Sequence, residues 1–159
     1  MTGPDVRRAG ADDAAEVAVL LHDFNVEFDT PTPEPPVLAG RLRGHLASGD
    51  LVALLAGEGG AGEDAVGVAL LSFRASAWSD GPAALLDELY VRPSLRGGGL
   101  GTALLDAACG VVRERGGELL EINVDGEDTD ARRFYERHGF THTDPGCTEP
   151  CLYYHRELG

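Results

Sequence analysis

Residues 85–102 read LLDELYVRPSLRGGGLGT, and this stretch decides the fold. An apolar strand ending at Val91 leads into the glycine-rich turn Gly97-Gly98-Gly99, and a segment with helical periodicity follows. Glycines let the backbone approach an anion closely, and the first turn of a helix offers unpaired N–H groups and the positive end of the helix dipole. The turn is therefore predicted to bind a phosphate group; the alternative is a tight connection that binds nothing.

Spacing separates the phosphate-binding motifs that such a turn can carry. The P-loop is excluded because it needs a lysine, and the chain contains none. The dinucleotide fingerprint G-x-G-x-x-G/A is excluded because its third small residue would fall on Thr102 or on Leu104. The pattern that remains is Arg96-x-x-Gly99-x-Gly101, directly behind a strand.

This pattern resembles the R/Q-x-x-G-x-G/A signature of the GCN5-related N-acetyltransferases, the GNAT family. Farther along, residues 128–140 read DTDARRFYERHGF and are similar to the family's second recurrent segment, N-x-x-A-x-x-F-Y-x-x-x-G-F. One position departs from it, since Asp128 stands where the family usually has Asn. Because the two segments are independent and occur in the expected order, the chain is identified as a GNAT member.

The predicted elements follow the family's order over nearly the whole chain. Periodicity predicts strands at about 6–9, 51–56, 66–75, 84–91, 119–124, 140–142 and 152–155, and helices at about 13–28, 37–48, 102–115 and 130–138. Residues 57–64 are predicted to form a hairpin tip and residues 29–36 a stiff proline-rich loop. The resemblance implies an α/β fold with a mostly antiparallel sheet, a splayed strand pair and flanking helices. The length fits a single domain over residues 1–159.

The resemblance implies acetyl-CoA as the acyl donor. Main-chain atoms of Leu89, Tyr90 and Val91 would bind the pantetheine amides where the two strands splay. The residues expected at the pyrophosphate are Arg96, Gly97, Gly98, Gly99, Leu100, Gly101 and Thr102. Asp128 falls on the family position that contacts the pantetheine arm, where a carboxylate can accept a hydrogen bond but cannot donate one.

Direct transfer needs a base for the amine and an acid for the departing sulfur. The resemblance assigns the acid to Tyr135, whereas its neighbour Phe134 fits a packing role better. Asp87 and Glu88 are the candidate bases, and strict strand alternation would place them on opposite faces, Asp87 with Leu89 and Glu88 with Leu86. A carboxylate on a wholly apolar face would be costly, which favours Glu88 slightly over Asp87.

The chain carries 27 acidic and 13 basic side chains, a net charge of −14. Such a surface disfavours nucleic acid and acidic membranes, and it attracts a cationic acceptor or simply keeps the protein soluble. The predicted acceptor is therefore a primary amine: a small amine, an antibiotic amine or a peptide amine. The alternative function is a non-catalytic acyl-CoA sensing module on the same fold. The oligomeric state stays open, with a homodimer among the alternatives.

Three cysteines, an odd number, favour a reducing compartment, and the sequence shows neither a signal-like N-terminus nor a membrane-length apolar run. These features predict a cytoplasmic location. His142, Cys147, Cys151 and His155 are metal-ligand types, but their spacing lies outside the usual zinc patterns. No metal is therefore expected, and direct transfer needs none.

Overall fold

The computed structural model describes residues 4–57 and 63–159. The chain divides into two compact units, Met1–Ile122 and Asn123–Gly159, and each is described by itself. Most of the predicted hairpin tip, residues 58–62, lies outside the described residues, as do the first three residues of the chain.

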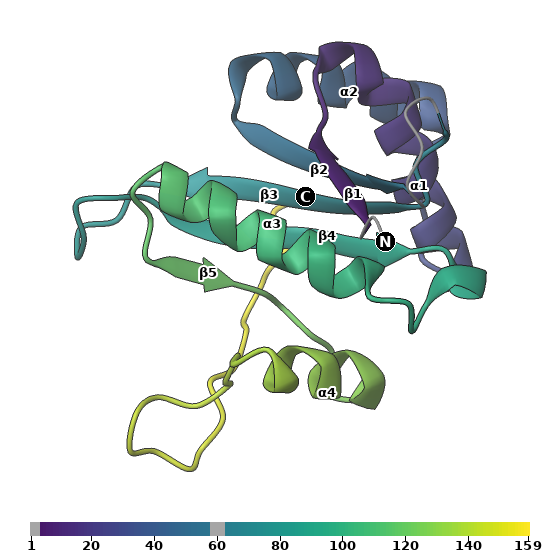
Figure 1. Ribbon diagram of the computed structural model, residues 1–159. Helices are drawn as coiled ribbons and strands as arrows, with labels where there is room; N and C mark the ends of the chain where they lie inside the picture. The colour runs from purple at the N-terminus through teal and green to yellow at the C-terminus, as the bar shows by residue number, and fades with distance from the viewer. Residues whose placement is uncertain (1–3, 58–62) are drawn as a thin grey trace. The chain divides into compact units, whose positions relative to one another are not determined.

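The first unit is built on a five-stranded mixed sheet. Its strands are β1 (Asp5–Arg8), β2 (Leu51–Gly57), β3 (Gly67–Arg74), β4 (Ala83–Val91) and β5 (Leu119–Glu121). They lie side by side in chain order, the first four antiparallel and β5 parallel to β4 (Figure 1). The predicted mixed, mostly antiparallel sheet is confirmed.

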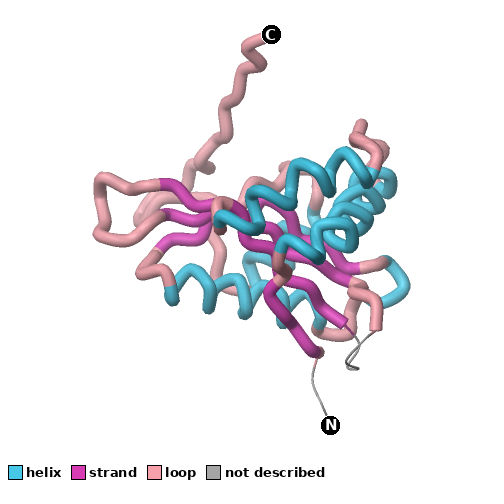
Figure 2. The backbone as a smooth tube through the Cα atoms, turned by 90° about the horizontal axis from the view of Figure 1, so that it is seen from above, coloured by secondary structure: helices cyan, strands magenta, loops and turns pink. Residues whose placement is uncertain are grey.

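Helices cover both faces of this sheet. α1 (Ala14–Glu27) and α2 (Pro35–Ser48) lie on one face, and α3 (Leu100–Glu114) lies on the other (Figures 1 and 2). The apolar side chains of α1 and α2 pack on alternate residues of the strands, among them Leu55, Val68 and Leu70. Successive strand residues face opposite sides of the sheet. The residues next to these in sequence, such as Leu54 and Leu71, therefore face α3 and are buried there.

Two short 3-10 turns complete the first unit. One, Ala11–Asp13, precedes α1, and the other, Pro93–Leu95, follows β4. α2 begins two residues earlier than predicted, at Pro35, because a proline in the first helical turn lacks only an N–H that would have no partner there. β5 is shorter than the predicted strand 119–124 and ends at Glu121.

The second unit contains α4 (Thr129–Arg137), which agrees with the predicted helix to within one residue at each end. The predicted closing strands at 140–142 and 152–155 are wrong, because the described residues there contain only one isolated bridge, Thr143 with Pro150. Apolar and aromatic side chains of residues 152–158 are largely exposed, Tyr154 by 85%. Their strand propensity finds no pairing partner among the described residues.

Candidate active site

The middle of β4 carries a bulge that sets the positions of the two candidate bases. Leu86 lies opposite Leu71 of β3, whereas Glu88 lies opposite Leu70, so Asp87 is the extra residue on β4. Leu70 and Leu71 are neighbours and face opposite sides of the sheet, and directly paired residues share a face. Leu86 and Glu88 therefore cannot share a face, which corrects the alternation expected from the sequence.

Glu88 faces the α1 and α2 side of the sheet. It lies two residues before Tyr90, which is opposite Val68 and buried in the cluster formed with α1 and α2. Glu88 is partly buried and Asp87 is exposed. Neither carboxylate has an ion pair among the residues that the structure describes.

Burial shifts the protonation of both carboxylates. Burial, together with the charge of the adjacent Asp87 as the smaller cause, raises the pKa of Glu88 to about 7. The pKa of Asp87 is also raised by desolvation, while a hydrogen bond from Ser72 opposes that shift. A carboxylate with a pKa near 7 can accept a proton at neutral pH and release it again, as general base catalysis requires.

The glycine-rich turn presents a row of backbone donors. Gly97 and Gly99 have φ angles of 82° and 90°, the left-handed region that glycine adopts without strain. Gly99 precedes α3 and makes no side-chain cap, and the N–H groups of residues 97–101 have no acceptor among the described residues. A Cβ added at Gly97 or Gly99 would meet nothing within 4 Å. The turn is open and fits an anionic group such as a diphosphate.

Two arginines beside this turn are held by α1. Arg92 Nη1 donates to Asp23 Oδ2 at 2.9 Å, and Arg96 Nη2 donates to Glu27 Oε1 at 2.8 Å. Arg96 Nε also donates to the carbonyl of Val91 at 2.9 Å. Sequence reasoning missed both carboxylates, because each pair is separated by 69 residues and no local pattern connects them.

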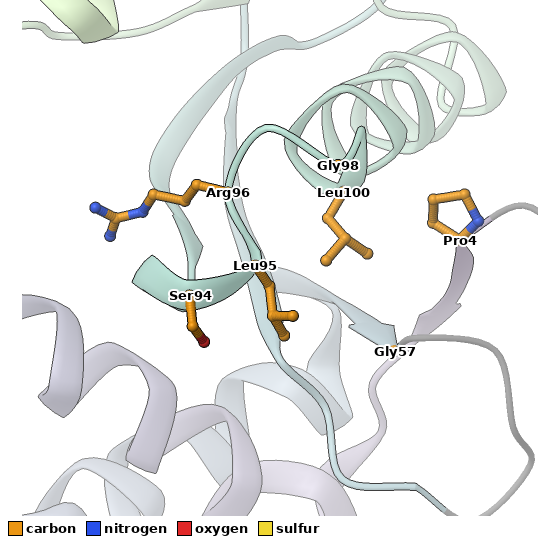
Figure 3. Close-up of a pocket in the computed structure, with 7 residues that line it drawn as sticks. All are labelled: Pro4, Gly57, Ser94, Leu95, Arg96, Gly98 and Leu100. Carbon is orange, nitrogen blue, oxygen red and sulfur yellow. The ribbon is translucent and has the colours of Figure 1, made fainter.

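A cavity of about 410 Å³ lies beside the turn. Leu95 and Leu100 point into the space that faces Pro4, whereas the Arg96 side chain points the opposite way (Figure 3). Among the described residues, Gly57, Ser94, Arg96 and Gly98 also line the cavity. Arg96 is thus directed away from the N-terminus of α3.

The strand pair β4 and β5 separates early. Its parallel pairing covers only residues 83–85 of β4, and the rest of β4 has no strand on that side among the described residues. Leu89, Tyr90 and Val91 lie in this part of β4, which pairs with β3 on its other side, and the Val91 carbonyl accepts from Arg96. The predicted splayed pair is thus present in the sheet.

The sequence profile of the acetyltransferase (GNAT) family matches residues 17–140, which include β4, the glycine turn and α4. The chain belongs to this family. Among relatives, the uncharacterised N-acetyltransferase YhfO of Bacillus subtilis is 28% identical over 148 residues, 93% of this chain and 96% of YhfO. A mycothiol acetyltransferase of Beutenbergia cavernae is 46% identical over 70 residues, 42% of this chain, and the match spans only about a quarter (24%) of that relative.

Solved structures agree with the family. A protein of Arthrobacter sp. FB24, provisionally described as an acetyltransferase, is 62% identical, with a TM-score of 0.89 over 97% of this chain and 96% of that one. An aminoglycoside acetyltransferase from an uncultured soil sample has a TM-score of 0.78 at 20% identity, covering 98% and 97% of the two chains, and shares the fold. The predicted family, fold and enzyme class are confirmed.

In this GNAT chain, the second motif lies in the second unit. Asp128 caps α4, its carboxylate accepting from the Ala131 N–H at 2.9 Å. Tyr135 is buried, and its ring lies 5.1 Å from that of Phe134 and 5.4 Å from that of Phe140. The roles of Asp128 at pantetheine and of Tyr135 as the acid stay predictions.

Two further observations concern the described part of this GNAT chain. Residues 4–57 and 63–159 contain no group of three or more histidine, cysteine or acidic side chains placed to hold a metal ion. None of the helices found there combines the length and the apolar character that a bilayer crossing requires.

Proposed function

We propose that this GNAT protein is an acetyl-CoA-dependent N-acetyltransferase that acetylates a small, cationic primary amine. The observation that carries the proposal is the combination, within one unit, of an open phosphate-binding turn and a partly buried carboxylate, Glu88, whose pKa is raised to about 7. The turn binds the diphosphate of the acetyl donor, and Glu88 takes a proton from the acceptor amine.

The binding roles follow from the backbone. The unpaired N–H groups of residues 97–101 take the diphosphate of the donor, and the unpaired part of β4 takes its pantetheine amides. Because these are main-chain contacts, they depend on the path of the turn more than on any one side chain. Acetyl-CoA supplies the activated thioester.

The chemical roles follow from protonation states. Glu88 takes a proton from the acceptor ammonium, and the freed amine nitrogen forms a bond to the acetyl carbonyl carbon while the bond from that carbon to sulfur breaks. Tyr135 donates a proton to the departing sulfur, a role that rests on the family motif, and its phenolate then takes the second proton that the nitrogen loses as it becomes an amide. Asp87, exposed beside Glu88, supplies a negative charge that favours an acceptor ammonium group.

The acceptor class is supported by charge and by relatives. A net charge of −14 raises the local concentration of cationic amines. Acetyltransferases whose names specify mycothiol and aminoglycosides are among the similar proteins, so amino sugars and aminoglycosides belong in an acceptor panel with polyamines and peptide amines. The family match includes residues of both units, which supports a single acetyltransferase domain over residues 1–159.

Free-thiol release from acetyl-CoA with this amine panel tests the proposal. We expect transfer to at least one cationic amine, lowered about 100-fold in kcat/KM by Glu88→Gln and unchanged by the matched Glu114→Gln, an exposed position on α3. Calorimetry with CoA separates the alternatives. Binding of CoA without transfer to any amine would support the sensing module, and absence of CoA binding would overturn the proposal altogether.

A further inference from the structure

The last two turns of α1 contact the end of β4 and the glycine turn at three successive points. Asp23 accepts from Arg92 at 2.9 Å, the Phe24 ring lies 5.3 Å from the Tyr90 ring, and Glu27 accepts from Arg96 at 2.8 Å. Asp23 and Glu27 are one helical turn apart and therefore lie on the same side of α1. Asp23 and Glu27 of α1 thus hold the two arginines, Arg92 and Arg96, that lie beside the turn.

Arg96 makes three contacts in this region. Its Nε donates to the Val91 carbonyl at 2.9 Å, its Nη2 donates to Glu27, and its guanidinium carbon lies 5.7 Å from the centroid of the Tyr90 ring. Figure 3 shows the side chain directed away from Gly98 and Leu100. The guanidinium of Arg96 thus contacts β4 through Val91 and Tyr90, and α1 through Glu27.

The geometry points to Arg96 and Glu27 as positioning residues for the donor: the ion pair fixes the path of residues 97–101, and Arg96 does not itself bind the diphosphate. This inference rests on the proposed function. Three fixed points, the Val91 carbonyl, the Tyr90 ring and Glu27, hold the residue that immediately precedes Gly97, where the chain enters its left-handed conformation. Loosening one of them frees the turn and so weakens the binding of a ligand held by main-chain N–H groups.

The two roles for Arg96 predict opposite effects of Glu27→Gln. If Arg96 positions the turn, neutralising Glu27 loosens it and weakens CoA binding. If Arg96 were a diphosphate ligand, the same change would release a competing anion and strengthen CoA binding or leave it unchanged. The Glu27 side chain is 25% exposed and that of Arg96 is 44% exposed, so the pair is of moderate strength. We expect an increase of about threefold to fivefold in the Kd of CoA.

The experiment is a double-mutant cycle on the full chain. Calorimetric Kd values for CoA are compared among the wild type, Glu27→Gln, Arg96→Gln and the double variant, with Glu114→Gln as the matched neutralisation on α3. We expect Glu27→Gln to weaken CoA binding in the wild type and to have no further effect in the Arg96→Gln background, with kcat within twofold of the wild type. Glu114→Gln should match the wild type.

A truncated donor distinguishes positioning from general loss of structure. S-acetyl-N-acetylcysteamine lacks the diphosphate, so its kcat/KM should be the same in Glu27→Gln and the wild type, whereas a damaged fold would lower it. An unchanged or lower Kd of CoA in Glu27→Gln, while the wild type binds CoA and transfers acetyl groups, would overturn this inference alone. A wild type that binds no CoA would overturn the proposed function and this inference with it.

Discussion

Glu88 lies directly opposite Leu70 of β3, one residue after the bulge at Asp87. The bulge places Glu88 on the α1 and α2 face, which is largely apolar around Leu70 and Tyr90. Burial there is the main cause of its raised pKa, and the adjacent Asp87 is the second. A local backbone irregularity therefore produces the side chain with the protonation behaviour that the proposed reaction needs.

The pH dependence of kcat/KM should follow the ionisation of the Glu88 carboxyl group. Because the base must be ionised, we expect kcat/KM for the amine to rise with pH through about 7 and to level off above it. Asp87→Asn removes a nearby negative charge, which favours ionised Glu88, so the rise should move to lower pH. Asp106→Asn on α3 is the matched control and should leave the midpoint in place. A midpoint that does not respond to Asp87→Asn would contradict the assignment of Glu88.

The ionised Glu88 carboxylate should lower the free energy of unfolding at neutral pH. The pKa of Glu88 in the folded protein is about 7, above the ordinary value of 4.5, so the unfolded chain loses this proton first as the pH rises. The free energy of unfolding should therefore fall between about pH 4.5 and 7, the reverse of a salt-bridged carboxylate. Glu88→Gln removes this penalty and should be more stable than the wild type by about 2 kcal/mol at pH 8, with a smaller difference at pH 5.

Urea unfolding at the two pH values measures this effect. Glu114→Gln, which neutralises an exposed glutamate, should show no comparable dependence on pH. If Glu88→Gln were less stable than the wild type at pH 8, the carboxylate would have a structural partner, and its role as an unpaired base would be lost. A variant that is more stable and inactive would instead show that Glu88 is kept for function.

Much of the site was predictable from the sequence because its signals are local. The strand 84–91, the glycine turn and the helices that became α3 and α4 all follow from periodicity and motif spacing within short windows. The bulge was not predictable, because LLDELYV shows no break in its pattern. The partners of Arg92 and Arg96 were not predictable either, since only the fold brings α1 to the turn. Residues 152–155 have strand propensity, but propensity alone supplies no pairing partner.

The conformation of Gly99 should be indispensable to donor binding. Gly99→Ala places a Cβ in open space, so no clash opposes it, but the left-handed φ of 90° costs a non-glycine residue about 1–2 kcal/mol. The turn should relax and CoA binding should weaken about tenfold, measured by calorimetry. Gly110→Ala, inside α3 and equally free of contacts, is the control: it should raise the Tm and leave the Kd of CoA unchanged. Equal Kd values in both variants would contradict a role for the turn.

Tyr135 should act through its hydroxyl group alone. Tyr135→Phe keeps the ring that packs against Phe134 and Phe140, so the variant should fold and its Kd for CoA should match that of the wild type. Loss of the acid should lower kcat about 100-fold, because the sulfur then departs without a proton. Tyr154→Phe makes the same chemical change on a ring that is 85% exposed and should leave kcat unchanged. A donor with a more acidic thiol, such as a thiophenyl acetate, should restore much of the rate to Tyr135→Phe, since its thiolate leaves without assistance. A rate equal to the wild type with acetyl-CoA itself would remove Tyr135 from the proposed chemistry and leave it as a packing residue of α4.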